Sequence, residues 1–337
     1  MILTRTPLRC SLLGGGSDYP AHYVAHGGSV LGLAIDKYVY VGVKRVPPGQ
    51  LMAHPQTKDP VPIRFRIQYS RVDDCLTVDD IHHPAVRAAI KYLGMENDRI
   101  EFTTFADLPG RSGLGGSSAF VVGCLHALLR LKDPRRAVTP MDLAREAIAF
   151  EQFYMREAVG SQDQLFAALG GMRYIKFGPE SHAHALRVSW VRIERLTECL
   201  VLAYTGLMRD AQPLAAAQIA EAPTNAAALQ ALSHLADDGF AWMLSERPLF
   251  RIGELLDESW RHKRKFAGVD NPQIDDLYAR GLKLGATGGK LLGAGGGGFL
   301  MFYVPEHARE AFESRIGAPL VRFGMAQRGS EVIINEP

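Results

Sequence analysis

The chain has 337 residues, of which 47% are hydrophobic and 22% are charged. These proportions indicate a globular protein with enough apolar residues for two medium-sized domains. The formal net charge of +2 is too balanced to indicate binding to nucleic acid or membranes, and without an 18-residue apolar run or a signal-peptide core the expected location is the cytoplasm.

The first half of the chain combines predicted sheet with a few helices. Strands are expected where β-branched and aromatic residues gather, over 1–10, 29–46, 62–70 and 99–106. Apolar spacing and capping residues predict helices over 84–93, 118–131 and 140–157, with a short one after Ser161.

The second half is predicted to be mostly helical. Helices are expected over 211–221, 225–245, 248–265, 271–284 and 305–316. Strands are expected over 171–177, 186–193, 199–205 and 297–304, with more near the C-terminus. The Pro179-Glu180-Ser181-His182 turn is a plausible joint, so we expect domains over 1–180 and 181–337.

A glycine-rich loop precedes the 118–131 helix. Glycines let backbone N–H groups crowd around a phosphate, and a helix N-terminus adds its own unsatisfied donors and positive dipole end. The loop therefore predicts an anion site, although an ordinary turn has similar glycine spacing. The candidate phosphate-binding residues are Pro109, Gly110, Gly113, Leu114, Gly115, Gly116, Ser117 and Ser118.

Glu151 interrupts the apolar stripe of the 140–157 helix, which contains Ala144, Ala147, Ile148 and Met155. A carboxylate at that position is expected to be desolvated, so it must find a partner. The residues alone leave two partners open, a metal ion or an arginine.

Asp163 follows Ser161 and precedes Gln164, and this pattern predicts a capping box. An aspartate in the first helical turn is stabilised by the helix dipole without any catalytic duty. Spacing alone therefore indicates a structural role for Asp163.

A second glycine run, 293–298, satisfies the GxGxxG pattern of dinucleotide-binding loops. Such a loop opens a helix, whereas the residues that follow this one predict a strand over 299–304. The chain also lacks a Walker A sequence, so neither motif explains the glycine loops.

Three segments lie in the order that the GHMP small-molecule kinases require. TPLRCSLLGGGSDY at 6–19 resembles their first motif, PGRSGLGGSSA at 109–119 their second, and KLLGAGGGGFLMF at 290–302 their third. Gly116 departs from the second motif, which has a serine there. The resemblance implies an α+β fold, with an N-terminal domain like domain 2 of ribosomal protein S5 and a ferredoxin-like C-terminal domain. Within the family, the heptose 7-phosphate kinase branch is the most similar.

The resemblance also implies roles for individual residues. ATP is expected on the glycine-rich loop, with Mg²⁺ held by Glu151 and by Ser117, or by Ser118 because Gly116 blurs the register. Asp163 would be the catalytic carboxylate that takes the proton of the attacking hydroxyl. Arg9 would lie beside Asp163 and keep it ionised.

The first motif bears on the substrate. Asp18 would bind sugar hydroxyls, while Gly15 and Gly16 replace a Glu-His pair of galactokinase-type motifs and leave space for a longer or phosphorylated tail. Gly295 and Gly296 would shape the same pocket. The candidate cations for an anionic tail are Arg111, Arg173, Lys176 and Arg209, of which Arg209 is favoured by the resemblance.

The function that the resemblance implies is ATP-dependent phosphorylation of the anomeric hydroxyl of a heptose 7-phosphate. Two alternatives stay open: a kinase acting at C1 of another sugar, such as a fucose-like or other hexose, and a non-catalytic sugar sensor on the same fold. The sequence selects neither a monomer nor a homodimer.

Overall fold

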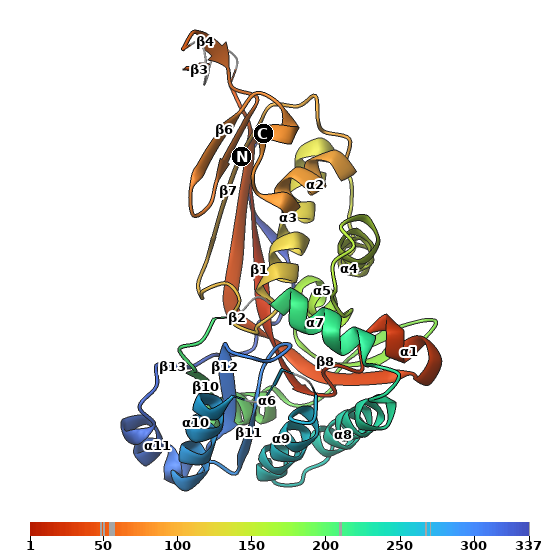
Figure 1. The fold of residues 1–337 in the computed structure, drawn as a ribbon, viewed down its shortest axis with the longest axis vertical. Coiled ribbons are helices and arrows are strands. Elements are labelled where there is room, and N and C mark those ends of the chain that lie inside the picture. The colour runs from red at the N-terminus through yellow and green to blue at the C-terminus, as the bar shows by residue number, and fades with distance from the viewer. Residues whose placement is uncertain are drawn as a thin grey trace.

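The computed structural model describes residues 1–47, 49, 51–53, 58–208, 211–266, 268–269 and 271–336. Within them, eight strands form a sheet whose main path is β14-β1-β2-β7-β5-β6, with β8 paired to β2 and β9 to β8. Their bounds are β1 Ile2–Leu13, β2 Gly28–Arg45, β5 Phe65–Gln68, β6 Val72–Cys75, β7 Ile100–Ala106, β8 Met172–Phe177, β9 His182–Ala185 and β14 Glu331–Asn335. The long antiparallel pair β1–β2 runs through the molecule (Figure 1).

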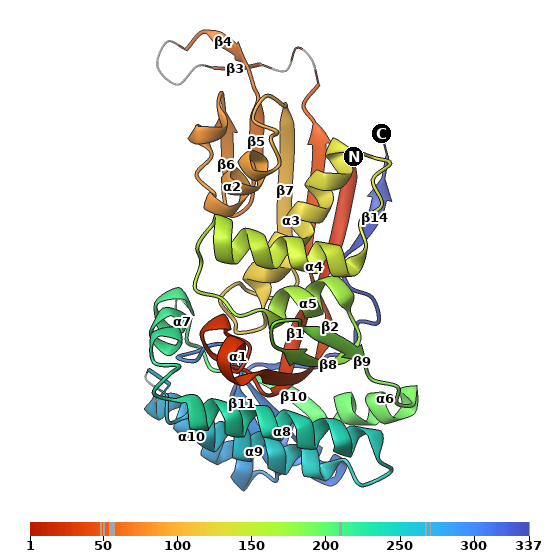
Figure 2. The same ribbon diagram turned by 90° about the vertical axis from the view of Figure 1, so that its right-hand side faces the viewer.

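Four helices lie on one face of this sheet (Figure 2). They are α2 Pro84–Tyr92, α3 Gly116–Lys132, α4 Pro140–Ala149 and α5 Gln162–Leu169, all at predicted positions. Thr139 caps α4 as its sequence indicates, because its hydroxyl accepts the Asp142 backbone N–H at 3.1 Å.

The helix predicted over 140–157 changes form after Ala149. Residues Phe150–Tyr154 make a π-helical turn, η2, in which the Met155 N–H donates to the Phe150 carbonyl at 2.8 Å. A π turn inserts one extra residue into a helix and often marks a functional site. Here it carries Glu151.

A second, antiparallel sheet has the order β11-β12-β10-β13. Its strands are β10 Leu200–Tyr204, β11 Gly288–Leu291, β12 Phe299–Tyr303 and β13 Leu320–Val321. The helices of this half are α6 Trp190–Cys199, α7 Ala211–Ala220, α8 Ala226–Leu244, α9 Phe250–Lys263, α10 Pro272–Lys283 and, after the short η3 Glu306–Ala308, α11 Arg309–Arg315. Helix α9 packs on β11 and β12, while α8 packs on β2 of the first sheet and so joins the two halves.

The strand predicted over 186–193 is wrong, because helix α6 begins at Trp190. The Ser189 hydroxyl caps it by accepting the Arg192 backbone N–H at 3.3 Å. Ile193, Leu196 and Thr197 are its buried residues, at steps of three and four along the chain. The buried residues of this segment therefore follow the helical period and not the alternation of a strand.

Several short elements were not predicted, including β6, β9 and the 3₁₀ turn η1, Val78–Asp80. Helix α1, Pro20–His26, begins with proline at its first position, a usual start signal. Strand β11 lies just before the glycine run, where the sequence predicted no regular element. A small hairpin pairs β3 Leu51–Ala53 with β4 Pro60–Pro62.

The α+β class is confirmed, whereas the boundary at 180/181 stays a prediction. Strands β9 and β14 follow that boundary in sequence but pair in the first sheet. The pairing of β14 with β1 brings the two chain ends together at one end of the molecule (Figures 1 and 2). Among the described residues, no helix combines the length and the apolar character needed to cross a membrane.

Candidate active site

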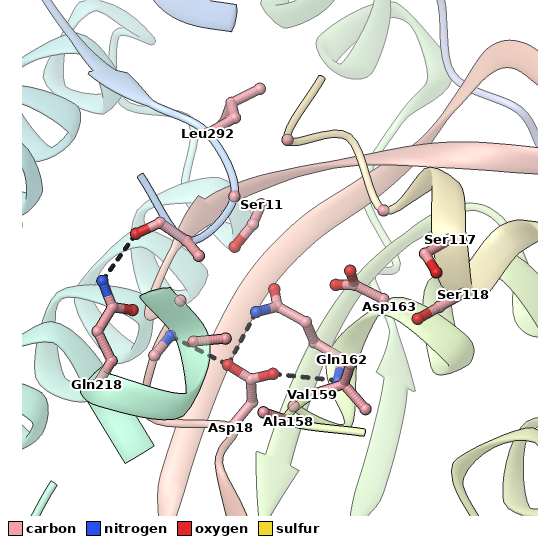
Figure 3. A pocket seen from close by; sticks show the side chains of 18 of the residues that line it. Ser11, Asp18, Ser117, Ser118, Ala158, Val159, Gln162, Asp163, Gln218 and Leu292 are labelled. Carbon is pink, nitrogen blue, oxygen red and sulfur yellow. Dashed lines mark hydrogen bonds between the residues drawn. The ribbon is translucent and has the colours of Figure 1, made fainter. Parts of the chain in front are cut away.

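A cavity of about 450 Å³ lies where the two halves meet. Its walls come from β1 and the loop after it, the loop before α3, the start of α5, helix α7, the end of α9, and β11 with the loop after it. We call it the central cavity; Figure 3 shows its lining from close by.

The three motifs contact one another at this cavity, the first through strand β1 and the other two through their glycine loops. The Arg9 N–H donates to the Leu114 carbonyl at 3.0 Å, and the Phe299 N–H donates to the Ser112 carbonyl at 3.2 Å. At Gly113, whose φ is +78°, a Cβ atom would lie 2.6 Å from the Leu292 carbonyl oxygen. Only glycine allows this approach, so the motifs are joined by backbone contacts.

Arg9 and Asp163 form a two-point ion pair at the cavity wall. The Arg9 Nε and Nη2 atoms donate to the two Asp163 carboxylate oxygens at 2.8 Å each, and Nη1 donates to the Gly113 carbonyl at 2.6 Å. Burial disfavours the charged guanidinium, but the attraction and hydrogen bonds of Asp163 outweigh it and raise the pKa of Arg9. Arg9 is 5% exposed, so the pair is rigid and largely dry on the arginine side.

Gly115 makes room for this ion pair. Its φ is +71°, and a Cβ atom there would lie 3.0 Å from Arg9 Cγ and 3.2 Å from Asp163 Oδ2. Gly115 is also the cap residue of α3, so the helix N-terminus begins beside the ion pair. The side chains of Ser117 and Ser118 lie next to Asp163 in Figure 3.

Glu151 is fully buried, as its place in the apolar stripe predicts. Its partners are neither arginine nor another acid: the Ser118 hydroxyl donates to Oε1 at 3.0 Å and the Gln164 amide donates to Oε2 at 2.5 Å. Burial raises the pKa of Glu151 to about 8, and these two hydrogen bonds offset only part of that rise.

The Ser118–Glu151 pair suits a magnesium ion. Mg²⁺ prefers oxygen ligands and is usually held by one or two carboxylates together with substrate phosphates. A buried carboxylate that lacks a cationic partner matches that need, and among the described residues no group of three or more His, Cys, Asp or Glu forms an all-protein metal cage. Ser117, the first choice by alignment, is exposed and lines the central cavity, whereas Ser118 is buried against Glu151.

Asp18 lies on the opposite side of the cavity from Ser117 and Ser118 (Figure 3). Its Oδ1 accepts the Gln162 amide at 2.8 Å and the Gly16 N–H at 3.0 Å, and its Oδ2 accepts the Gln162 N–H at 3.3 Å. Burial, and then repulsion from Asp163, raise the pKa of Asp18. The side chain is therefore fixed, with its carboxylate at the cavity wall.

Not every predicted phosphate-loop residue reaches the central cavity. Leu114 is buried in the core, while Pro109 and Gly110 are exposed and lie outside the lining. The predicted residues that line the cavity are Gly113, Gly115, Gly116, Ser117 and Ser118.

The predicted substrate residues are likewise divided. Gly15, Gly16 and Arg111 line the cavity. Gly295 and Gly296 do not; Gly295 faces Val269 and Leu214 instead.

Two of the candidate cations lie outside the cavity lining. Arg173 donates to the Leu169 and Gly170 carbonyls, and Lys176 lies 6.0 Å from the centre of the Tyr174 ring. Arg209 lies outside the described residues.

Sequence reasoning missed four residues that shape the site. Gln162 and Gln164 hold Asp18 and Glu151, so the capping box expected from Ser161 and Gln164 is wrong and Ser161 makes no cap bond. The two others, Lys263 and Lys290, are buried lysines at the cavity wall.

Comparisons with known proteins agree with this architecture. Residues 81–171 match the model of the GHMP kinases N terminal domain, and residues 246–321 match GHMP kinases C terminal. The chain belongs to the GHMP kinase family, and it is a phosphotransferase by that membership.

Individual relatives span the whole chain. A D-glycero-alpha-D-manno-heptose 7-phosphate kinase of Campylobacter jejuni is 28% identical, with 90% of this chain and 89% of the relative covered. A mevalonate kinase of Pyrococcus abyssi is 25% identical, with 95% of each chain covered.

Solved structures show the same fold. A D-glycero-D-manno-heptose 1-phosphate kinase from Bacteroides thetaiotaomicron superposes with a TM-score of 0.79 at 22% identity, with 100% of both chains covered. A Lactococcus lactis galactokinase complexed with galactose gives a TM-score of 0.67 at 16% identity, with 98% and 95% covered.

Proposed function

We propose that the protein is an ATP- and Mg²⁺-dependent sugar kinase that phosphorylates the anomeric hydroxyl of a heptose 7-phosphate to give the 1,7-bisphosphate. The observation that carries this proposal is the Arg9–Asp163 ion pair, which lines a cavity to which all three motifs contribute residues. Phosphoryl transfer needs held phosphates, a placed hydroxyl and an acceptor for its proton, and this arrangement offers a candidate for each.

In the proposed reaction the sugar hydroxyl oxygen bonds to the γ-phosphorus of ATP while the bond from that phosphorus to the bridging β,γ oxygen breaks, so ADP leaves. Asp163 accepts the hydroxyl proton. Arg9 fixes both carboxylate oxygens of Asp163 and so orients the base toward the cavity.

The nucleotide phosphates are proposed to lie against the loop at 113–118, where α3 begins. Ser118 and Glu151 would hold Mg²⁺, with Ser117 as the other candidate hydroxyl. The metal would neutralise charge on the β- and γ-phosphates when bound. Glu151 can serve in this way because it lies in the wall behind Ser118, which itself lines the cavity.

The choice of a heptose phosphate rests on similarity and on space. The Campylobacter jejuni heptose 7-phosphate kinase is similar to this protein over 90% of the chain. Gly15 and Gly16 line the cavity without side chains, so a longer sugar can extend past Asp18. Asp18 is proposed to accept hydrogen bonds from ring hydroxyls.

A kinase for C1 of a fucose-like sugar is the second candidate. An L-fucokinase/L-fucose-1-P guanylyltransferase of Bacteroides fragilis is 25% identical over 88% of this chain, which spans 34% of that longer protein. This candidate keeps the roles of Arg9 and Asp163 and changes only the sugar.

The test is ADP release by the purified protein with Mg-ATP across a panel of acceptors: D-glycero-D-manno-heptose 7-phosphate, mannose 6-phosphate, mannose, fucose, galactose and mevalonate. We expect turnover with the heptose 7-phosphate and its loss in Asp163→Asn. Turnover confined to fucose would favour the second candidate. If no acceptor supports ADP release while a sugar still binds, the result would favour a sensor.

A further inference from the structure

Two buried lysines line the central cavity, and the proposed transfer chemistry does not use them. Lys263 ends helix α9 and is 8% exposed, and Lys290 lies in strand β11 and is 3% exposed. Both come from the second half of the chain, and they share the cavity with Gly15 and Gly16. Fully buried lysines are rare unless a partner compensates their charge.

Backbone carbonyls use only part of the hydrogen-bonding capacity of these lysines. The Lys263 ammonium donates to the Leu291 carbonyl at 3.0 Å and also to the Gly293 carbonyl, and the Lys290 ammonium donates to the Leu12 carbonyl at 3.1 Å. Because an ammonium has three donors, one remains at Lys263 and two at Lys290.

Within the described part of the chain, neither lysine makes an ion pair with a carboxylate at 4.0 Å or less, and the hydrogen bonds of both go to backbone carbonyls. Burial lowers the pKa of Lys263 well below its ordinary value and that of Lys290 to about 7; Arg9 lowers both further, whereas Asp18 acts in the opposite direction. Burial therefore disfavours the charged ammonium groups, and an anion bound between them would stabilise their protonated forms.

An unpaired hydroxyl lies in the same region. Ser11 is 5% exposed and lines the cavity, yet its Oγ has no hydrogen-bond partner. A Cβ atom at Gly15 would lie only 3.2 Å from that oxygen, so the glycine avoids a close contact with the buried hydroxyl at the cavity wall. Figure 3 shows the Ser11 side chain between those of Gln162 and Leu292.

We propose that Lys263, Lys290 and Ser11 form a subsite for a phosphate monoester carried by the substrate at the end remote from the reacting hydroxyl. This inference rests on the proposed function and deepens it, because it names the residues that would select a sugar phosphate over the free sugar. The three remaining ammonium donors of the lysines and the Ser11 hydroxyl can together hydrogen-bond the three terminal oxygens of a phosphate monoester, each of which can accept more than one bond. The lysines and Asp163 both have Asp18 as an electrostatic neighbour, so one sugar ring can lie against Asp18 and reach both ends.

The test compares a phosphorylated and a free sugar in single variants. Lys263→Met and Lys290→Met remove the charge and keep similar length, while Lys265→Met, at an exposed position two residues after Lys263, is the matched control. We expect each buried-lysine variant to raise KM for heptose 7-phosphate by about 100-fold, the effect of losing charge-assisted hydrogen bonds. We expect unchanged kcat/KM for the unphosphorylated heptose and unchanged KM for ATP.

Two results would overturn the subsite. An equal loss of kcat/KM on both sugars, together with a lower Tm, would show that the lysines only stabilise the backbone loops. A rise in KM for ATP with unchanged KM for the sugar phosphate would assign them to the nucleotide. Ser11→Ala covers the case in which a lysine variant does not fold, because it removes an unpaired atom and should still raise the KM for the sugar phosphate.

A binding measurement separates this inference from the proposed function. If the wild-type protein transfers phosphate to none of the sugars, the proposed function fails. Thermal unfolding in the presence of heptose 7-phosphate at about 5–10 mM, a concentration suited to a weak ligand, then tests the subsite. The subsite predicts that the sugar phosphate raises the Tm of wild type and not of Lys290→Met. No rise in wild type would overturn it.

Discussion

Arg9 on β1 and Asp163 at the start of α5 are joined by two parallel hydrogen bonds of 2.8 Å, although 154 residues separate them in sequence. Arg9 also donates to the Gly113 carbonyl, so the ion pair is tied to the glycine loop before α3. This relationship connects the fold to the proposed chemistry: the loops position the arginine, and the arginine positions the carboxylate.

Asp163→Asn should abolish most turnover while keeping the fold. The amide can still accept one bond from Arg9 but cannot take a proton, so kcat should fall by about 10²–10⁴-fold, the contribution of a positioned general base. Steady-state ADP release and ATP binding by calorimetry measure the two effects. A kcat within a factor of about three of wild type would remove Asp163 from the role of base.

Glu151→Gln should stabilise the protein and weaken its use of magnesium. The Glu151 pKa is raised from 4.5 to about 8, so the folded protein binds the extra proton and loses stability as pH rises between those values. Glutamine removes that loss, and Gln164, whose Oε1 has no partner, can turn its amide to accept the new N–H.

The gain in unfolding free energy should be about 4 kcal/mol at pH 7.5 and about 1 kcal/mol at pH 5, measured by urea denaturation without Mg²⁺. Activity should require a higher Mg²⁺ concentration for half-maximal rate. A variant with wild-type Mg²⁺ dependence would show that Glu151 is not a metal ligand.

Gly115→Ala should damage both stability and activity. The residue has φ +71°, which costs an alanine about 1 kcal/mol, and the new Cβ would press on Arg9 and Asp163. Gly206→Ala is the matched control, because Gly206 has a similar φ of +76° with nothing within 4 Å of its Cβ position. We expect both variants to lower Tm and only Gly115→Ala to lower kcat; equal kcat values in the two would contradict the close fit.

His126 should make the protein less stable in mild acid. It lies on α3 with Nδ1 3.0 Å from the Ser330 hydroxyl, and burial, with repulsion from Arg130, lowers its pKa to about 4. Between about pH 6.5 and 4 the unfolded chain binds a proton that the folded chain does not, so stability falls as pH falls.

The His126 titration should lower the free energy of unfolding by about 2 kcal/mol between pH 7.5 and pH 5. The pH dependence of unfolding of His126→Gln should lack this contribution. Urea denaturation at the two pH values measures it, with the exposed His234→Gln as the control for removing an imidazole. Parallel pH slopes for wild type and His126→Gln would contradict the assignment.

The sequence predicted those parts of the site that local patterns determine. The stripe position of Glu151 predicted its burial, and the glycine run at 113–116 predicted a loop that leads directly into a helix, as it does into α3. Local patterns could not supply partners from elsewhere in the chain: Gln164 had the spacing of a cap residue, but tertiary packing directs its amide to Glu151.

The burial of Lys263 could have been predicted from its spacing in the sequence. This lysine continues the buried face of α9 after Leu256, Ser259 and Trp260, at the same helical steps that singled out Glu151. The surrounding run of basic residues concealed this spacing, because a charged stretch usually indicates an exposed helix end. Lys290 had no such signal, since the strand that holds it is only four residues long.

³¹P and ¹H NMR of the product formed from heptose 7-phosphate and Mg-ATP would locate the transferred phosphate. We expect a second phosphate whose phosphorus couples to the anomeric proton, formed in step with ADP and absent with Asp163→Asn. A phosphate on any other carbon, or an anomeric phosphate made equally well by Asp163→Asn, would contradict the proposed reaction.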